Sequence, residues 1–175
     1  MKVTIPYTPR KQQAFIHTEL DKHRFSVLCC HRRFGKTVML INHLIKECMM
    51  NKNHQPRFAY IAPTYSQAKK IAWDYLKFYT KGLPKTKYNE TELRCDFFNG
   101  SRITLLSSEN PDSIRGIYLD GVVCDEASQI SRELIDEVIR PALSDRKGWM
   151  VLCSTPKGMN NIFYDMYLKA RSEKD

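Results

Sequence analysis

The segment from Cys30 to Thr37 restricts the fold of this chain most, because it ends in Gly-Lys-Thr directly after an apolar run. Residues 25–30 have the pattern of a buried strand, and an amphipathic pattern follows over residues 36–50. Strand, loop and helix in this order form a phosphate-binding loop, in which backbone N–H groups and the helix N-terminus face the phosphates. The expected nucleotide-binding residues are Cys30, His31, Arg32, Arg33, Phe34, Gly35, Lys36 and Thr37.

Two residues of this loop have distinct expected roles. Lys36 would reach the β- and γ-phosphates as a catalytic residue, and the Thr37 hydroxyl would hold Mg²⁺. Cys30 stands where the pattern G-x-x-x-x-G-K-[ST] has its first glycine. Because of this departure, the match to the phosphate-binding motif needs support from the rest of the sequence.

The context is a second apolar run, Gly121 to Ala127, which ends in two carboxylates. A buried parallel strand has such a continuous apolar run, and functional groups of open α/β sheets lie at the carboxyl ends of the strands. We therefore expect Asp125 to bind Mg²⁺ and Glu126 to act as the general base on the attacking water. The alternative is a solvated acidic pair at the end of a strand.

Composition indicates one globular domain over residues 1–175, with 42% hydrophobic residues to form a core. No stretch approaches the roughly 20 apolar residues of a membrane span, so no membrane partner is expected. None of the six cysteines forms C-x-x-C, which argues against zinc and fits a reducing compartment. The five histidines show no metal-ligand spacing, and we interpret them as ordinary polar residues.

Charge is unevenly distributed along the chain. Residues 1–87 hold 17 Lys and Arg against 4 Asp and Glu, whereas residues 88–175 hold 11 against 15. Such asymmetry favours a polyanionic partner such as DNA, and the alternative is a basic surface that only aids solubility.

Strand-like and helix-like segments alternate, which predicts an α/β fold with a mostly parallel sheet flanked by helices. The pair Asn99-Gly100 between two strand-like runs predicts a β-hairpin insertion. The pattern fits a P-loop NTPase of the additional-strand, catalytic-glutamate type. We expect helices over residues 10–21, 36–50, 66–79, 131–140 and 161–171, strands over 25–30, 58–63, 93–98, 102–106, 122–124 and 149–153, and a loop over 81–91.

Taken in order, these motifs resemble the ATPase domain of bacteriophage terminase large subunits, the motors that package DNA into procapsids. The resemblance runs from Tyr7 to about Lys169. Relaxed phosphate loops with arginines before Gly-Lys-Thr are familiar in that family, so Cys30 does not count against ATP binding. The segment 122–127 resembles its Walker B motif, and the segment 153–158 resembles its coupling motif.

The resemblance also implies roles for residues outside the two Walker motifs. Ser154 and Thr155 would sense the γ-phosphate and couple hydrolysis to movement. Residues 7–13 resemble the adenine-binding segment, with Gln13 favoured as the adenine-binding residue and Gln12 left open.

Two arginines have several possible roles under this resemblance. Arg115, in the segment 110–116, would be a trans-acting arginine finger and so a catalytic residue. The alternative is a structural arginine that pairs with Asp112 or Asp120. Arg33 would contact a phosphate, contact a neighbouring subunit or remain in solvent, and its action in cis or in trans stays open.

Family membership would imply ATP and Mg²⁺ as ligands, and double-stranded DNA, the portal protein, the procapsid and the small terminase subunit as partners. The location would be the cytoplasm of an infected bacterial host. A homo-oligomeric ring is expected in the assembled motor, and a monomer in isolation. Large terminases also carry a nuclease domain and a lid segment, and neither the nuclease nor most of the lid is found in these 175 residues.

Two other functions remain compatible with the motifs. A superfamily-2-like helicase or translocase core would share the box at residues 125–128, the Ser-Thr-Pro at 154–156 and a glutamine motif. A non-hydrolysing, nucleotide-dependent assembly module would explain Cys30, but it would not need Lys36, Thr37 and both carboxylates.

Overall fold

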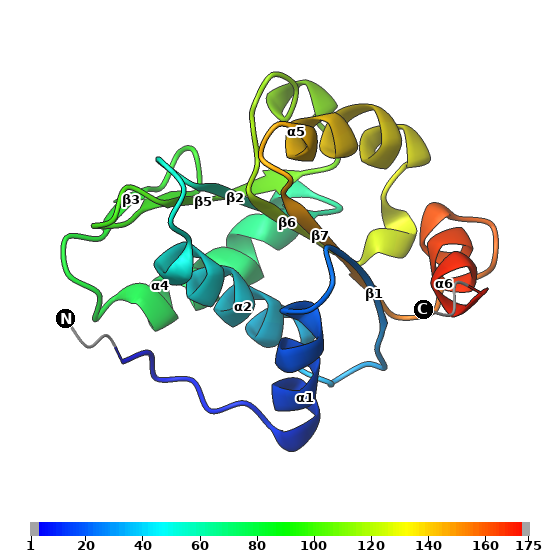
Figure 1. Ribbon diagram of the computed structural model, residues 1–175, viewed down its shortest axis with the longest axis horizontal. Helices are drawn as coiled ribbons and strands as arrows, with labels where there is room; N and C mark the ends of the chain where they lie inside the picture. The colour runs from blue at the N-terminus through cyan, green and yellow to red at the C-terminus, as the bar shows by residue number, and fades with distance from the viewer. Residues whose placement is uncertain (1–3, 173–175) are drawn as a thin grey trace.

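A seven-stranded sheet lies at the centre of the computed structural model, which describes residues 4–172 (Figure 1). The strand order is β1-β7-β6-β2-β5-β4-β3. The first five strands in this order run parallel, and β4 and β3 extend the sheet, with β4 antiparallel to β5 and β3 antiparallel to β4. The strands are β1 (Phe25–Cys29), β2 (Arg57–Ala62), β3 (Lys87–Asn89), β4 (Arg94–Asp96), β5 (Arg102–Ser107), β6 (Gly121–Asp125) and β7 (Trp149–Ser154).

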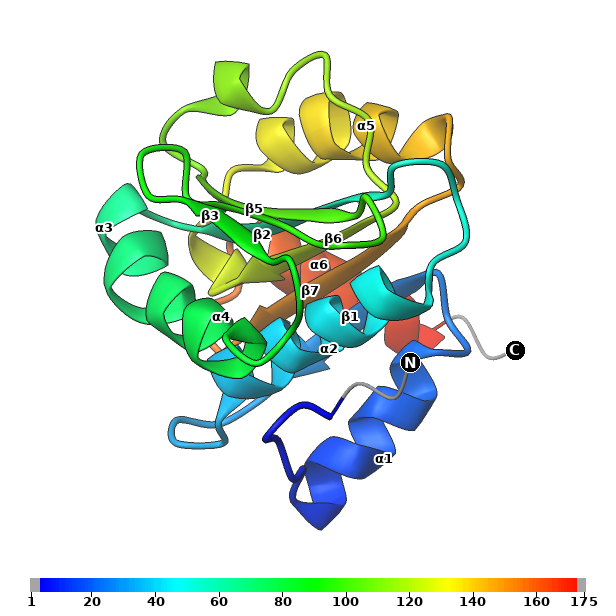
Figure 2. The ribbon, with the colours of Figure 1, turned by 90° about the vertical axis from the view of Figure 1, so that its left-hand side faces the viewer.

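Helices cover both faces of this sheet, as Figure 2 shows: α2 and α4 lie on one side and α5 lies on the other. The α-helices are α1 (Lys11–Leu20), α2 (Lys36–Met50), α3 (Tyr65–Gln67), α4 (Trp73–Thr80), α5 (Arg140–Ser144) and α6 (Ile162–Ser172). Two π-helical turns, Ala68–Ala72 and Leu134–Ile139, join α3 to α4 and precede α5. Short 3-10 turns cover Pro111–Ser113 and Ala127–Gln129.

Each face of the sheet has its own hydrophobic core. Successive side chains of a strand point to opposite faces, so Val123 packs in the core with α2 and α4, while Val122 and Cys124 pack in the core that includes α6. All five residues of β6 are buried. The apolar run before Asp125 is therefore a central strand covered on both faces, as the sequence predicts.

The order of the strands confirms the predicted fold class. β7 lies between β1, which leads into the phosphate loop, and β6, which ends in Asp125. β7 is thus the inserted strand, and the hairpin strands β4 and β5 lie toward the opposite edge of the sheet. Because β1, β7 and β6 are parallel, their carboxyl ends meet at one edge and place three motifs beside one another.

Two details of the hairpin region differ from the sequence prediction. The predicted loop over residues 81–91 contains a short edge strand, β3, which pairs with β4. The hairpin turn spans residues 97–101: the Gly100 N–H donates to the Phe97 carbonyl at 3.0 Å, and the φ of Gly100 is +81°. Asn99 has no positive φ, so the turn is not the two-residue Asn-Gly type. Its side chain instead donates to the Cys48 carbonyl at 2.8 Å, a tertiary contact that sequence spacing cannot reveal.

Candidate functional site

The phosphate loop lies between β1 and α2, at the carboxyl edge of the sheet. Gly35 is the N-cap of α2 and has a φ of +84°, which favours glycine. Cys30 does not have a positive φ, and its N–H donates to the Ser154 carbonyl at 3.0 Å. The loop therefore accommodates a side chain at the position where the standard motif has glycine.

The Cys30 side chain is buried and lies against Cys153 on β7. A hydrogen bond from the Cys153 thiol lowers the pKa of the Cys30 thiol, and burial opposes this shift. His31, Arg32 and Arg33 are exposed, and Arg33 adopts a left-handed φ of +63°. Arg33 is thus available for a phosphate or a neighbouring molecule.

Gln13 on α1 supports the phosphate loop from the outside. Its amide nitrogen donates to the carbonyls of Phe34 at 3.2 Å and Gly35 at 3.4 Å, and its amide oxygen accepts from the Arg10 N–H at 3.0 Å. Gln13 is only 4% exposed. The neighbouring Gln12 is exposed and lines a largely apolar groove between α1 and the loop, together with Phe15. Gln13 therefore positions the phosphate loop through its side-chain amide. The side-chain amide of Gln12 instead faces solvent.

Thr37 and Asp125 meet where α2 begins and β6 ends. The Thr37 hydroxyl donates to Asp125 Oδ2 at 2.9 Å. The same carboxylate oxygen accepts from the Tyr60 hydroxyl at 2.5 Å, and Oδ1 accepts from the Glu126 N–H at 2.9 Å. Burial raises the pKa of Asp125, and these hydrogen bonds oppose the shift. Hydroxyl and carboxylate oxygens are the donors that Mg²⁺ prefers, so this pair fits the ion that the motif implies.

Glu126 bends away from the end of β6 and faces the phosphate loop. Its φ of +49° is left-handed, a conformation that costs a non-glycine residue of the order of 1–3 kcal/mol. Lys36 Nζ lies 3.2 Å from Glu126 Oε1. The hydroxyls of Ser154 and Thr155 lie 3.5 and 3.3 Å from Oε2. The structure thus brings together the predicted base, the predicted phosphate-binding lysine and the two predicted coupling hydroxyls.

Sequence reasoning missed two polar residues of this site. Tyr60, on β2, holds Asp125, and the Ser128 hydroxyl lies 2.8 Å from the Ser154 hydroxyl. Ser128 follows Glu126 by two residues, a proximity that could have drawn attention to it. Tyr60 stands within an apolar strand, and no motif separates it from an ordinary core tyrosine.

Arg115 lies apart from these residues, in the segment that leads from β5 to β6. Its side chain is 62% exposed, and Nε lies 3.5 Å from Asp112 Oδ1. The following Gly116 has a φ of +77°. Asp120 is not its partner, because that carboxylate accepts from the Arg57 N–H and the Asn53 amide. Arg115 is therefore a surface arginine with a weak local ion pair, free to reach another molecule.

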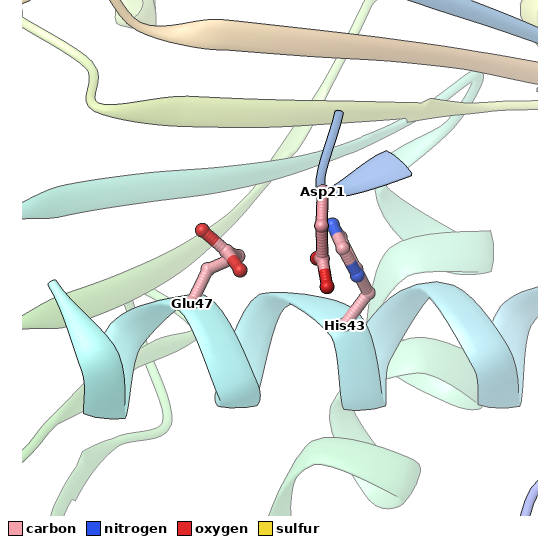
Figure 3. A group of neighbouring side chains, drawn as sticks. All are labelled: Asp21, His43 and Glu47. Atoms are coloured by element: carbon pink, nitrogen blue, oxygen red, sulfur yellow. The ribbon is translucent and has the colours of Figure 1, made fainter. Parts of the chain in front are cut away.

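A second polar cluster lies beside α2 and joins α1 to it. His17 Nδ1 and His43 Nδ1 are 3.2 Å apart, and the two rings stack with centroids 5.4 Å apart. Figure 3 shows Asp21 against the His43 ring and Glu47 one turn further along α2. Lys46 Nζ lies 2.5 Å from both Asp21 oxygens, so a lysine already provides the positive charge there, and we assign no metal to this cluster.

The prediction that the histidines are ordinary polar residues is wrong for these two. Burial is the main cause that lowers the pKa of both, and it brings that of His43 to about 3. The i and i+4 positions of His43 and Glu47 put them on one helix face. His17 lies on another helix, α1, so its place in this cluster depends on tertiary packing.

His43, which is buried, and His17, which is half-buried, should make folding sensitive to acid. Their pKa is lower in the folded chain, so below about pH 6.5 the unfolded chain binds more protons and is favoured. Neutral His43 contributes fully to the free energy of unfolding above about pH 6.5, and this contribution is lost as the pH falls toward about 3. From about pH 6.5 to about pH 5 we expect a loss of about 2 kcal/mol from His43 alone. Urea unfolding of the wild type and of His43→Gln would measure it.

The variant should lose most of this acid dependence. The exposed His23→Gln is the control and should keep the wild-type slope. Equal slopes for all three proteins would contradict neutral burial of His43.

Comparisons with a family model and with known proteins all match the same protein family. Residues 31–175 match the family model described as the terminase large subunit, T4-like-virus type, N-terminal. A terminase large subunit of Thermus phage G20c is 30% identical over 181 residues, which cover 93% of this chain and 36% of that protein. The corresponding protein of Escherichia phage T5 is 28% identical, over 91% of this chain and 37% of that protein. The chain therefore spans little more than a third of these relatives.

Solved structures show the same fold. The large terminase ATPase domain of Thermus phage P74-26 superposes with a TM-score of 0.78 at 28% identity, over 94% of this chain and 71% of that chain. The large terminase of a thermophilic bacteriophage, in complex with ATP-gamma-S, has a TM-score of 0.75 at 17% identity, over 94% of this chain and 42% of that chain. This second match is a likeness of fold alone. Among residues 4–172, no helix is both long and apolar enough to cross a membrane.

Proposed function

This chain belongs to the terminase large subunit family, and from that premise we propose that it hydrolyses ATP to drive double-stranded viral DNA into a procapsid. The observation that carries the proposal is the convergence of Lys36, Thr37, Asp125 and Glu126 at one edge of the sheet. These residues come from two elements far apart in sequence, α2 and the end of β6. Their meeting supplies a phosphate-binding loop with a carboxylate beside it. The family match favours this function over the helicase alternative.

Nucleotide would bind across the loop at the N-terminus of α2. Lys36 would contact the γ-phosphate, and its side chain is only 10% exposed. Thr37 and Asp125 would hold Mg²⁺, which neutralises charge on the β- and γ-phosphates when bound. The buried carboxylate is oriented from both oxygens, so its remaining lone pairs have a fixed direction.

Glu126 would orient and deprotonate the attacking water. Its carboxylate is 31% exposed, which leaves it open to a water molecule, and it lies next to Lys36. Binding of a triphosphate to Lys36 would exchange that ion pair for phosphate contacts and release Glu126 toward the water. Ser154 and Thr155, hydrogen-bonded to the same carboxylate, would transmit this change to the segment before α6.

DNA, the portal protein, the procapsid and the small terminase subunit are the proposed partners of the whole motor. The basic first half of the chain supports a polyanionic partner. A ring of copies in the assembled motor would allow Arg115 to act on a neighbour, and the exposure of that side chain supports this role. The host cytoplasm is the proposed location.

Replacing Glu126 with glutamine tests the chemistry directly. Glu126→Gln should bind Mg²⁺-ATP with near-normal affinity, because shape and loop contacts remain. Its turnover should fall by about 10²–10⁴, the usual contribution of a general base. Steady-state phosphate release and equilibrium nucleotide binding measure the two quantities.

Asp125→Asn should behave differently, with weaker Mg²⁺ dependence and lower nucleotide affinity. Glu133→Gln, at an exposed glutamate further along the chain, is the matched control and should retain activity. Normal turnover in Glu126→Gln together with loss in Asp125→Asn would show that the two roles are reversed. ATP binding without turnover by the wild-type motor would instead favour the assembly-module alternative.

A further inference from the structure

Tyr60 is a buried tyrosine whose hydroxyl reaches the candidate metal-binding carboxylate. It is 3% exposed, and its hydroxyl donates to Asp125 Oδ2 at 2.5 Å. The Thr37 hydroxyl shares the same acceptor oxygen at 2.9 Å.

The sheet register explains why this tyrosine can reach Asp125. Tyr60 on β2 is the direct partner of Val123 on β6, and Asp125 lies two residues further along β6 on the same face. The long side chain of Tyr60 spans this offset of two residues between adjacent parallel strands and reaches the carboxylate. Phenylalanine at this position would leave the ring in the core and remove only the hydrogen bond.

Hydrogen bonds to both oxygens fix the orientation of the Asp125 carboxylate. The Glu126 N–H holds Oδ1, while the hydroxyls of Tyr60 and Thr37 hold Oδ2. If Thr37 turned its oxygen toward a metal ion, Tyr60 would be the remaining side-chain donor that orients Oδ2. Partners that orient a metal-binding carboxylate typically change metal affinity by about 10- to 100-fold when they are removed.

We propose that Tyr60 is a positioning residue that orients Asp125 for the nucleotide-bound divalent cation. The assignment rests on the proposed ATPase function. Tyr60 is buried and its hydroxyl contacts Asp125, so it would act through that carboxylate on metal affinity and leave the chemical step intact once metal is bound.

Metal binding, measured apart from turnover, tests this assignment. Mn²⁺ replaces Mg²⁺, and its binding to the protein with ADP is followed by electron paramagnetic resonance. Tyr60→Phe should bind Mn²⁺ about 10- to 100-fold more weakly than the wild type, whereas its affinity for ADP without metal should be unchanged. Saturating Mn²⁺ should restore its ATP turnover to near the wild-type rate.

Tyr88→Phe is the matched control. It removes another tyrosine hydroxyl, which lies 2.9 Å from the Thr80 hydroxyl in a region remote from Asp125, and it should bind Mn²⁺ like the wild type. Thermal unfolding is compared first, and Tyr60→Met provides a second variant without the hydroxyl.

Two outcomes would overturn the assignment of Tyr60 alone, and a third would overturn the proposed function with it. Wild-type Mn²⁺ affinity in Tyr60→Phe would overturn the role of Tyr60 and leave the ATPase proposal intact. Equal losses of ADP affinity with and without metal, not restored by Mn²⁺, would reduce Tyr60 to a structural residue. Failure of the wild type itself to bind Mn²⁺ with ADP would overturn both proposals.

Discussion

Lys36→Ala should abolish detectable ATP turnover. Lys36 lies in the phosphate loop, and its ammonium is 3.2 Å from Glu126. Its loss removes a charge-assisted contact to the phosphates, at the point where charge develops in phosphoryl transfer. Loss of one stabilising donor in an active site costs about 10²–10³ in rate, and a full charge should exceed that range. Phosphate release under saturating ATP measures the effect.

The variant should still fold, because Lys36 is a first-turn residue of α2 and alanine is a good helix former. Lys52→Ala, at an exposed lysine just beyond the end of α2, is the control and should hydrolyse ATP normally. Wild-type turnover in Lys36→Ala would exclude this loop as the catalytic phosphate site.

Arg115→Ala should affect only the assembled motor. Its side chain is 62% exposed and lies outside the cluster around Asp125. The nucleotide affinity of the isolated chain should therefore stay nearly unchanged. An arginine finger supplied by a neighbour is worth about 10³–10⁵ in turnover, so ATPase activity and DNA packaging of the assembled motor should fall on that scale. Arg132→Ala, similarly exposed and also paired with an aspartate, is the matched control.

Mixing separates action in trans from a structural role. Arg115→Ala subunits keep Glu126, and Glu126→Gln subunits keep Arg115, so each supplies what the other lacks at a shared interface. The mixed motor should regain turnover that neither variant has alone. If Arg115→Ala lost folding stability and showed no complementation on mixing, Arg115 would have only a structural role as the local partner of Asp112.

Most elements of the parallel sheet could be predicted, because each has a local signal. The helix predicted over residues 36–50 agrees with α2 (Lys36–Met50), and the apolar runs became β1, β2, β6 and β7 within a residue or two. The edge strand β3 could not be predicted, since Lys87–Asn89 has no apolar pattern and owes its conformation to pairing with β4. The hairpin and the place of its turn at Asn99-Gly100 were predicted, but the two-residue turn type was wrong, because Asn99 has no positive φ.

The positions of the predicted Walker residues followed from sequence alone because their geometry is local. A Gly-Lys-Thr at the start of a helix fixes where the lysine and hydroxyl point, and an Asp-Glu pair after a buried strand must emerge at its carboxyl end. The sequence alone thus determined the fold class, the phosphate loop and the two carboxylates.

Only the tertiary structure decided which other side chains surround these residues. Tyr60 reaches Asp125 because β2 lies beside β6, and Ser128 meets Ser154 because β7 lies beside β6. Gln13 supports the phosphate loop, and His17 stacks on His43, through the docking of α1. Each of these contacts depends on strand order and helix packing, which are set by non-local burial of apolar surface and leave no spacing pattern in the chain.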